Sequence, residues 1–463
     1  MTRVGLLVGG LVAASLCAAC VGPEVSYQRG VDAAAADDAA AAAAYFESAA
    51  KDDYGPAQRE LGLRYLEGNG VPRDPEQGLA WLRRGAEAHH ADCQYTLGVV
   101  LWEGENVPRK RPEAVRWLQR AARAGQPEAQ LYLGTLNDEG GLRPALKSRA
   151  ADWYRRSAAQ GNGQAAVRLG RLYATGQGVD ESQERAVRYF RLAAEAGDAD
   201  GQFALGSRLQ TGNGVEENLE EAVLWYGRAA EQGHPEAAYN LAVAHHHGFG
   251  TEADPADALV WYEKAASAGY APAFAEVGML RQGDELGEPD PETAAEWYRR
   301  GAERGDPTAK VRLGSLYSQG LGVPRDNAEG LRWYRVAAAQ GDAKAQLNIG
   351  FAYDQGLAVE EDPAQAVFWY RKAASQGNAQ AQYNLGRCYA EGRGVKASAT
   401  HARSLFESSA EQGLASAQYG LAVLYDRGEG GLRNGIKALR WAKAAAEQGN
   451  EDAEQLVRKL EEE

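Results

Sequence analysis

The stretch that decides the fold runs from Ala309 to Gly341 and reads AKVRLGSLYSQGLGVPRDNAEGLRWYRVAAAQG. Around Leu313 its apolar residues recur three or four positions apart, which is the spacing of one helix face. Gly320 stands where a left-handed helix end is expected, and Asp326 stands where the capping residue of a new helix is expected. Trp333 then opens the packing face of a second helix. The stretch therefore predicts two helices joined by a short turn.

This pattern repeats along almost the whole chain. A leucine or an equivalent residue recurs every 36 residues, at Leu61, Leu97, Leu133, Leu169, Leu205, Leu241, Val277, Leu313, Ile349, Leu385 and Leu421. A period of this length marks stacked repeats, because one helix pair cannot bury its apolar face alone. The 463 residues therefore predict an all-α solenoid of eleven helix-turn-helix repeats over residues 55–449.

Both ends of the array are expected to be closed by half a repeat. Residues 33–54 are rich in alanine, yet Tyr45 and Phe46 lie 36 positions before Trp81 and Leu82. Residues 450–463 continue the register of the last repeat and end in charged residues. We expect a single capping helix in each segment, because the end faces of a solenoid would otherwise be exposed.

The first nineteen residues are predicted to be a signal sequence. Arg3 precedes an apolar run that is too short to span a bilayer comfortably. The segment LCAAC at 16–20 resembles the cleavage box of a bacterial lipoprotein, which implies that Cys20 carries the lipid and that residues 20–32 form a tether. Val21 stands where an inner-membrane lipoprotein of enteric type would carry Asp, so the resemblance implies the outer membrane. The alternative is an ordinary signal sequence, cut after residue 18 or 19, that leaves a soluble periplasmic or secreted protein.

Charge and cysteine content narrow the classes of partner and chemistry. The formal charge of −14 argues against nucleic acid or an anionic membrane surface as the main partner. Cys93 and Cys388 fall at positions that hold small or apolar residues in other repeats. We expect both to be buried, free and structural.

The repeat resembles the Sel1-like repeat family, a relative of tetratricopeptide repeats. The motif A-x-x-x-L-G-x-x-Y-x-x-G-x-G-V, followed by A-x-x-W-Y-x-x-A-A-x-x-G, is nearly literal over residues 165–197, 309–341 and 381–413. The resemblance covers residues 33–463 and implies a right-handed superhelix used in protein–protein interaction. The seventh repeat departs most, with Asp284 and Gly287 in the turn positions of Gly and Val, and predicts a rearranged turn.

Motifs that could carry chemistry have simpler explanations. Gly-x-Gly pairs recur in the same slot of successive repeats, so they indicate turns and not a phosphate-binding loop. His245, His246 and His247 point about 100° apart on a helix and cannot all reach one metal ion. Basic residues two and three positions after each ring, such as Arg299 and Arg300, are typical of a solvated helix face. We therefore predict no enzyme, no metal site and no cofactor.

A binding groove, by similarity to tetratricopeptide arrays, would be lined by the first helix of each repeat. Its variable polar positions beside the leucine column are the candidates, because amide and guanidinium groups suit peptide backbone and carboxylates. These candidates are Arg168, Arg171, Asn240, Arg312, Asn348, Asn384 and Arg387.

The sequence thus predicts a lipid-anchored periplasmic scaffold that holds other envelope proteins or peptide segments and meets the membrane through its lipid only. A sharper form, similar to the helical-repeat lipoprotein of alginate secretion, would assemble an exopolysaccharide export complex. One alternative is a regulatory binder of an envelope sensor or signalling protein. Another is a β-lactamase-like enzyme, but the regularly spaced disulfide pairs of such Sel1-like proteins are absent from this sequence.

Overall fold

The computed structural model describes residues 22–139 and 144–462. All 25 regular elements within these ranges are α-helices, which confirms the all-α class. The signal sequence and Cys20 lie outside the described residues.

The chain forms two compact units, residues 1–229 and 230–463. The helices of the first unit are α1 (Pro23–Ala35), α2 (Ala39–Lys51), α3 (Gly55–Glu67), α4 (Pro75–Glu87), α5 (Ala91–Glu103), α6 (Arg111–Arg123), α7 (Pro127–Glu139), α8 (Pro144–Ala158), α9 (Gly163–Thr175), α10 (Gln183–Glu195), α11 (Ala199–Thr211) and most of α12 (Leu219–Glu231). The helices of the second unit are α13 (Pro235–His247), α14 (Pro255–Ser267), α15 (Ala271–Gln282), α16 (Pro291–Glu303), α17 (Pro307–Gln319), α18 (Asn327–Ala339), α19 (Ala343–Gln355), α20 (Pro363–Ser375), α21 (Ala379–Glu391), α22 (Ala399–Glu411), α23 (Ala415–Arg427), α24 (Gly435–Ala446) and α25 (Glu451–Glu462).

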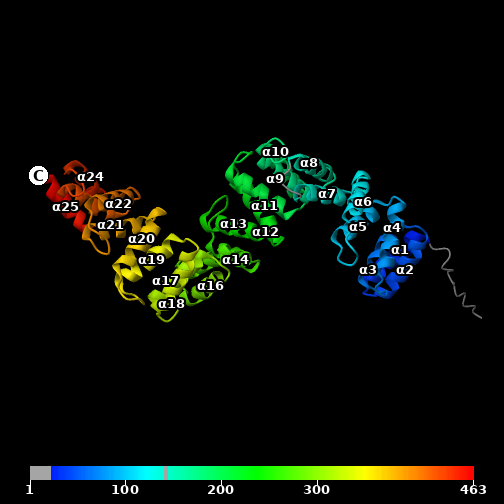
Figure 1. The fold of residues 1–463 in the computed structure, drawn as a ribbon, viewed down its shortest axis with the longest axis horizontal. Coiled ribbons are helices and arrows are strands. Elements are labelled where there is room, and N and C mark those ends of the chain that lie inside the picture. Colours follow the sequence, from blue (N-terminus) through cyan, green and yellow to red (C-terminus); the bar gives the residue numbers. More distant parts are fainter. Residues whose placement is uncertain (1–21, 140–143, 463) are drawn as a thin grey trace, which may run out of the picture. The chain divides into compact units, whose positions relative to one another are not determined.

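Within each unit, helices pack against their neighbours in the chain, as α9 does against α10 and α17 against α18 (Figure 1). Odd-numbered helices are the first helices of the repeats, and even-numbered helices are the second. First helices of successive repeats also touch, as α3 does α5 and α15 does α17. Such nearest-neighbour stacking is the solenoid arrangement that the period predicts.

A glycine of the first helix and a ring of the second helix meet at the centre of most repeats. A Cβ added to Gly350 would lie 2.6 Å from the ring of Tyr370, twenty residues later. Tyr370 is buried, whereas Trp369 before it is only half-buried. Trp333 too is half-buried, and both tryptophans pack against the edge of a core cluster, whereas the tyrosine after each of them takes the central place. The glycine is required because the two helix backbones approach too closely for a side chain.

Glutamine pairs, in which the acceptor is buried or half-buried, form a second regular contact between repeats. Gln376 Nε2 donates to Gln346 Oε1 at 2.8 Å, and Gln412 donates to Gln382 at 2.8 Å. Gln382 in turn donates to the backbone oxygen of Ala374 at 3.4 Å. These bonds give buried amides the partners that they need.

The turns between helices follow the sequence pattern. Gly320 ends α17 in the left-handed region, with φ of 73°. Asp326 caps α18 by accepting from the backbone N–H of Ala328 and Glu329. In the seventh repeat, α15 ends one residue early and Gly283 is extended, with φ of −79°. The rearranged turn predicted for this repeat is confirmed.

Helix α1 occupies the stretch that the sequence assigned to a polar tether. The Tyr27 ring lies 5.5 Å from that of Phe46 and 5.4 Å from that of Tyr54, and Gly30 packs against Phe46. Thus α1 and α2 form a helix pair, and the single capping helix expected over 33–54 is wrong as well. Helix α1 was not predicted from the sequence because it consists largely of alanine and short polar residues, which form no strong apolar face with helical spacing.

Candidate functional site

The seven candidate groove residues all lie on first helices. Arg168 and Arg171 belong to α9, Asn240 to α13, Arg312 to α17, Asn348 to α19, and Asn384 and Arg387 to α21. The last four line hollows that adjoin one another, all within the second unit.

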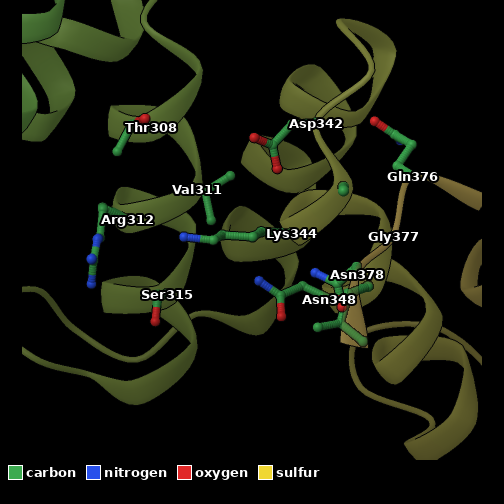
Figure 2. Close-up of a pocket in the computed structure, with 12 residues that line it drawn as sticks. Thr308, Val311, Arg312, Ser315, Asp342, Lys344, Asn348, Gln376, Gly377 and Asn378 are labelled. Carbon is green, nitrogen blue, oxygen red and sulfur yellow. The ribbon is translucent and has the colours of Figure 1, made fainter. Parts of the chain in front are cut away.

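The larger hollow has a volume of about 670 Å³ and lies between α17, α19 and the turn before α21. Its lining includes Arg312, Lys344 and Asn348, together with the apolar Val311 and Leu347. Figure 2 shows the Lys344 side chain reaching from α19 toward Val311 and Arg312 on α17. The hollow therefore combines two cationic groups and an amide with an aliphatic floor.

A second hollow, of about 350 Å³, continues this surface toward α21. Leu347 and Asn348 line both hollows, while Asn384 and Arg387 line the second alone. Phe351 also lines it and is 47 % exposed, so its ring offers apolar surface in this hollow. We call this surface of α17, α19 and α21 the cationic groove.

Two of the three charged side chains that line the larger hollow are positive, Arg312 and Lys344, and the third is Asp342. Arg312 and Lys344 are exposed and take part in no ion pair within the described ranges. Helix α17 carries no acidic residue, and the Asp342 carboxylate already accepts from the backbone N–H of Ala345 at 2.7 Å. Arg387 is less available, because it faces Glu391 at 3.4 Å. Two cations without an ion-pair partner in the described part of the chain thus lie between α17 and α19.

Lys344 and Phe351 were not among the sequence candidates. Phe351 occupies the repeat position of Arg171 and Arg387, and Lys344 occupies that of Thr308 and Gln380. The only signal that could have found them is this shared position, because the residue type there varies from repeat to repeat.

The remaining candidates lie apart from the cationic groove in the chain. Arg171 of α9 forms an exposed ion pair with Asp200 at 3.2 Å. Arg168 lies near the hydroxyl of Tyr154, whose pKa is raised to about 12 by burial and lowered in part by Arg168. Asn240 lies on α13, half-buried. Arg171 and Arg168 therefore already serve contacts within the protein.

The row of basic residues after each ring contacts the repeats themselves. The residue three positions after the tryptophan lies over its indole, 3.6–5.3 Å from the ring centroid, in Arg84–Trp81, Arg120–Trp117, Arg156–Trp153, Arg228–Trp225, Lys264–Trp261, Arg300–Trp297 and Lys372–Trp369. One position earlier, Arg371 donates to the Tyr389 hydroxyl of the next repeat at 3.2 Å. This row is therefore part of the stack, since cations over aromatic faces are stabilising.

The surroundings of the histidine cluster and of the two cysteines are those of structural residues, not of a metal site or a reactive thiol. His246 Nε2 lies 2.9 Å from a carboxylate oxygen of Glu285. Over residues 22–139 and 144–462, no group of three or more His, Cys, Asp or Glu is placed to hold a metal ion. Cys93 and Cys388 are free and buried, as predicted, and burial raises their thiol pKa to about 12 and about 11.

None of the helices in the described part of the chain has the length and apolar character needed to cross a bilayer.

Comparison with known proteins identifies the repeat. The family model of the Sel1 repeat matches residues 20–54, 55–90, 91–126, 127–162, 163–198, 199–234, 235–270, 275–306, 307–342, 343–378, 379–414 and 415–450. The first match contains α1 and α2, which agrees with the extra helix pair. A search of curated proteins finds no match.

Two solved structures resemble this chain over most of their length. A protective antigen of uropathogenic Escherichia coli that displays an SLR fold is 33% identical, with a TM-score of 0.80; the match covers 91% of this chain and 90% of that one. A Sel1 repeat protein from Oxalobacter formigenes is also 33% identical, with a TM-score of 0.56, and the match covers 67% of this chain and 90% of that one.

Proposed function

Because the chain belongs to the Sel1 repeat family, we propose that it is a scaffold whose cationic groove holds an extended acidic segment of a partner protein. A solenoid of these repeats suggests a protein–protein interaction scaffold, and proteins with this fold are generally non-catalytic. The observation that carries the proposal is the pair of unpaired cations, Arg312 and Lys344, beside Asn348 in one hollow.

Charge favours an acidic partner. Two cations without ion-pair partners on neighbouring helices create a positive potential, which attracts carboxylates and orients them as they approach. A partner segment with Asp or Glu side chains would supply the missing counter-charges.

The other groups of the cationic groove suit an extended peptide. Asn348 lines both hollows and offers an amide donor and acceptor, which can pair with a peptide C=O and N–H. Phe351, exposed beside Leu347, gives an apolar side chain of the partner a place to anchor. We therefore expect a segment in which acidic and apolar residues alternate.

Binding of a synthetic peptide to the full chain tests this proposal. The probe is a fluorescein-labelled octapeptide with blocked ends, in which glutamate alternates with leucine, and the readout is fluorescence anisotropy at low salt. Arg312→Glu with Lys344→Glu should weaken binding roughly tenfold or more, because each exposed ion pair contributes up to about 1 kcal/mol and each reversal adds repulsion.

A matched variant separates the groove from overall charge. Arg116→Glu with Arg188→Glu makes the same charge change at exposed positions on the second helices α6 and α10. This control should bind the peptide as wild type does. Equal losses in both variants, or no loss in the groove variant, would remove the support for the cationic groove as the binding surface.

We also propose that the scaffold is a lipoprotein of the bacterial outer membrane that faces the periplasm, acylated at Cys20. The support is the segment LCAAC at 16–20, followed by Val21. Cys20→Ala should move the protein from the membrane fraction to the soluble periplasm, because one acyl chain and its linked lipid supply the anchor. Crosslinking in cells then tests the sharper proposal: polysaccharide synthase or porin subunits should be recovered if the scaffold assembles an exopolysaccharide export complex.

A further inference from the structure

Two first helices of the first unit have the opposite charge character from α17. Helices α5 and α7 contain Asp92, Glu103, Glu128, Asp138 and Glu139 and no Lys, Arg or His. Asp138 is bound by Lys147, so it is neutralised locally. The other four take part in no ion pair within the described residues.

A hollow of about 240 Å³ lies where α5 meets α3. Leu63 of α3 and Val99 of α5 give it an aliphatic floor, and Tyr95 lies beside them. Glu67 and Glu103, the exposed last residues of α3 and α5, stand at its edge. We call this surface the acidic hollow.

Aromatic rings extend the acidic hollow toward α7. The Tyr95 ring meets that of Tyr132 edge to face, with centroids 6.4 Å apart. Burial, and then the carboxylates of Glu128 and Glu103, raise the pKa of Tyr95. Burial and Glu103 act in the same direction on Tyr132, raising its pKa to about 12. The negative potential of the carboxylates therefore reaches both rings.

The acidic hollow also holds a polar group without a partner. Thr96 is 8 % exposed and lines the hollow, and its hydroxyl makes no hydrogen bond within the described part of the chain. Because this hydroxyl has no partner in that part of the chain, it is free to accept from or donate to a ligand bound in the hollow.

The nearby guanidinium groups are used by the protein itself. Arg109 donates to the backbone oxygen of Glu103 at 2.6 Å, and Arg73 donates to Asn106 at the edge of the hollow at 2.7 Å. Arg59 lies 3.6 Å from Glu60. Arg73 and Arg109 keep their charges in these contacts, but within the described residues neither Glu67 nor Glu103 forms an ion pair, so both carboxylates can meet an external cation.

We propose that the acidic hollow is a second docking site, which takes a basic segment of a partner protein in which lysine or arginine alternates with apolar residues. The cationic heads meet Glu67, Glu103 and the tyrosine faces, and their aliphatic stems lie along Leu63 and Val99. The site is independent of the cationic groove, since it belongs to the other unit. The scaffold then holds two kinds of partner segment, distinguished by charge.

The test uses the full chain and a fluorescein-labelled octapeptide with blocked ends, in which lysine alternates with leucine. Glu67→Gln with Glu103→Gln removes both charges and keeps side-chain shape. We expect anisotropy to show roughly five- to twenty-fold weaker binding at low salt, since each exposed ion pair contributes up to about fivefold. Raising the salt concentration should shrink this difference, because the contacts are exposed.

A matched control distinguishes this site from attraction to the negative chain as a whole. Glu87→Gln with Glu195→Gln removes the same charge from the exposed last residues of α4 and α10. This control, and the Arg312→Glu, Lys344→Glu variant, should bind the basic peptide at least as tightly as wild type. The proposal is overturned if the peptide fails to bind wild type, or if the Glu87, Glu195 control loses as much binding. Neither result would affect the separate proposal for the cationic groove.

Discussion

Replacement of Gly278 by alanine should destabilise the seventh repeat, although alanine is the better helix former. A Cβ at this position would lie 2.4, 2.6 and 2.8 Å from three ring carbons of Tyr298. Tyr298 is 0 % exposed, and its hydroxyl donates to Gln282 at 2.9 Å. The ring is therefore enclosed by the core and fixed at its far end, so it cannot easily move aside.

Two opposing effects set the magnitude. An alanine in place of glycine inside a helix gains about 1 kcal/mol. Forcing an extra carbon into a packed core costs typically about 1–3 kcal/mol. Ala242 stands in the equivalent position of the sixth repeat, opposite Tyr262, so this helix pairing can adapt to some degree. We expect a net loss of up to about 2 kcal/mol, concentrated in α15 and α16.

Urea denaturation followed by circular dichroism measures the stability, and hydrogen exchange of the α15 and α16 amides locates the change. Gly227→Ala is the matched control, because a Cβ at Gly227 in α12 would meet nothing within 4 Å. The control should be more stable than wild type by about 0.5–1 kcal/mol. If Gly278→Ala gained as much as this control, contact with the ring would not explain the glycine of this repeat position.

Three further outcomes are expected from the same structure. In a variant without the two cysteines of the first twenty residues, iodoacetamide at pH 8 should label Cys93 and Cys388 only after unfolding, because thiols with pKa of about 12 and about 11 form very little thiolate. Lys459 and Arg433 lower the pKa of Asp426, so the anchoring of α25 should be retained above about pH 4 and weaken as the pH falls through the lowered pKa. Limited proteolysis of α25 should follow this pH dependence. The Asp426→Asn variant should show weaker anchoring of α25 already at pH 7. Deletion of residues 163–198, one whole repeat, should leave a shorter helical protein with a cooperative melt, because the contacts are between neighbours.

The sequence was sufficient for the fold because each repeat position has one environment throughout the array. Leucine at positions such as Leu313 and glycine in the turns are required by packing and backbone geometry, and both recur visibly. The sequence does not show which of two neighbouring large aromatic residues lies at the centre of a repeat. Trp297 and Tyr298 are equally good core residues by type, and only the close approach of Gly278 decides that the tyrosine is central.

The functional surface was only partly predictable, for the opposite reason. Residues that give a groove its specificity occupy positions that the stack leaves free, so their types vary and no period reveals them. Arg312 and Asn348 were found because their repeat position was known, but Phe351 was missed because it breaks the polar character of its column.

The charge contrast between α5 and α17 produces charged surfaces only because the repeats stack and bring residues of neighbouring first helices together. Each helix alone has an unremarkable composition, with two acidic residues in α5 and two basic residues in α17. Lys310 of α17 is buried and donates to Gly305 and Gln340, which leaves Arg312 as the free cation of that helix. Lys344, on the next first helix, is the second cation beside Arg312. In the same way Glu67, on the preceding first helix, is the second carboxylate beside Glu103. The two proposed binding surfaces therefore each combine residues of successive repeats, about 32–36 positions apart in the chain, and no single motif contains either of them.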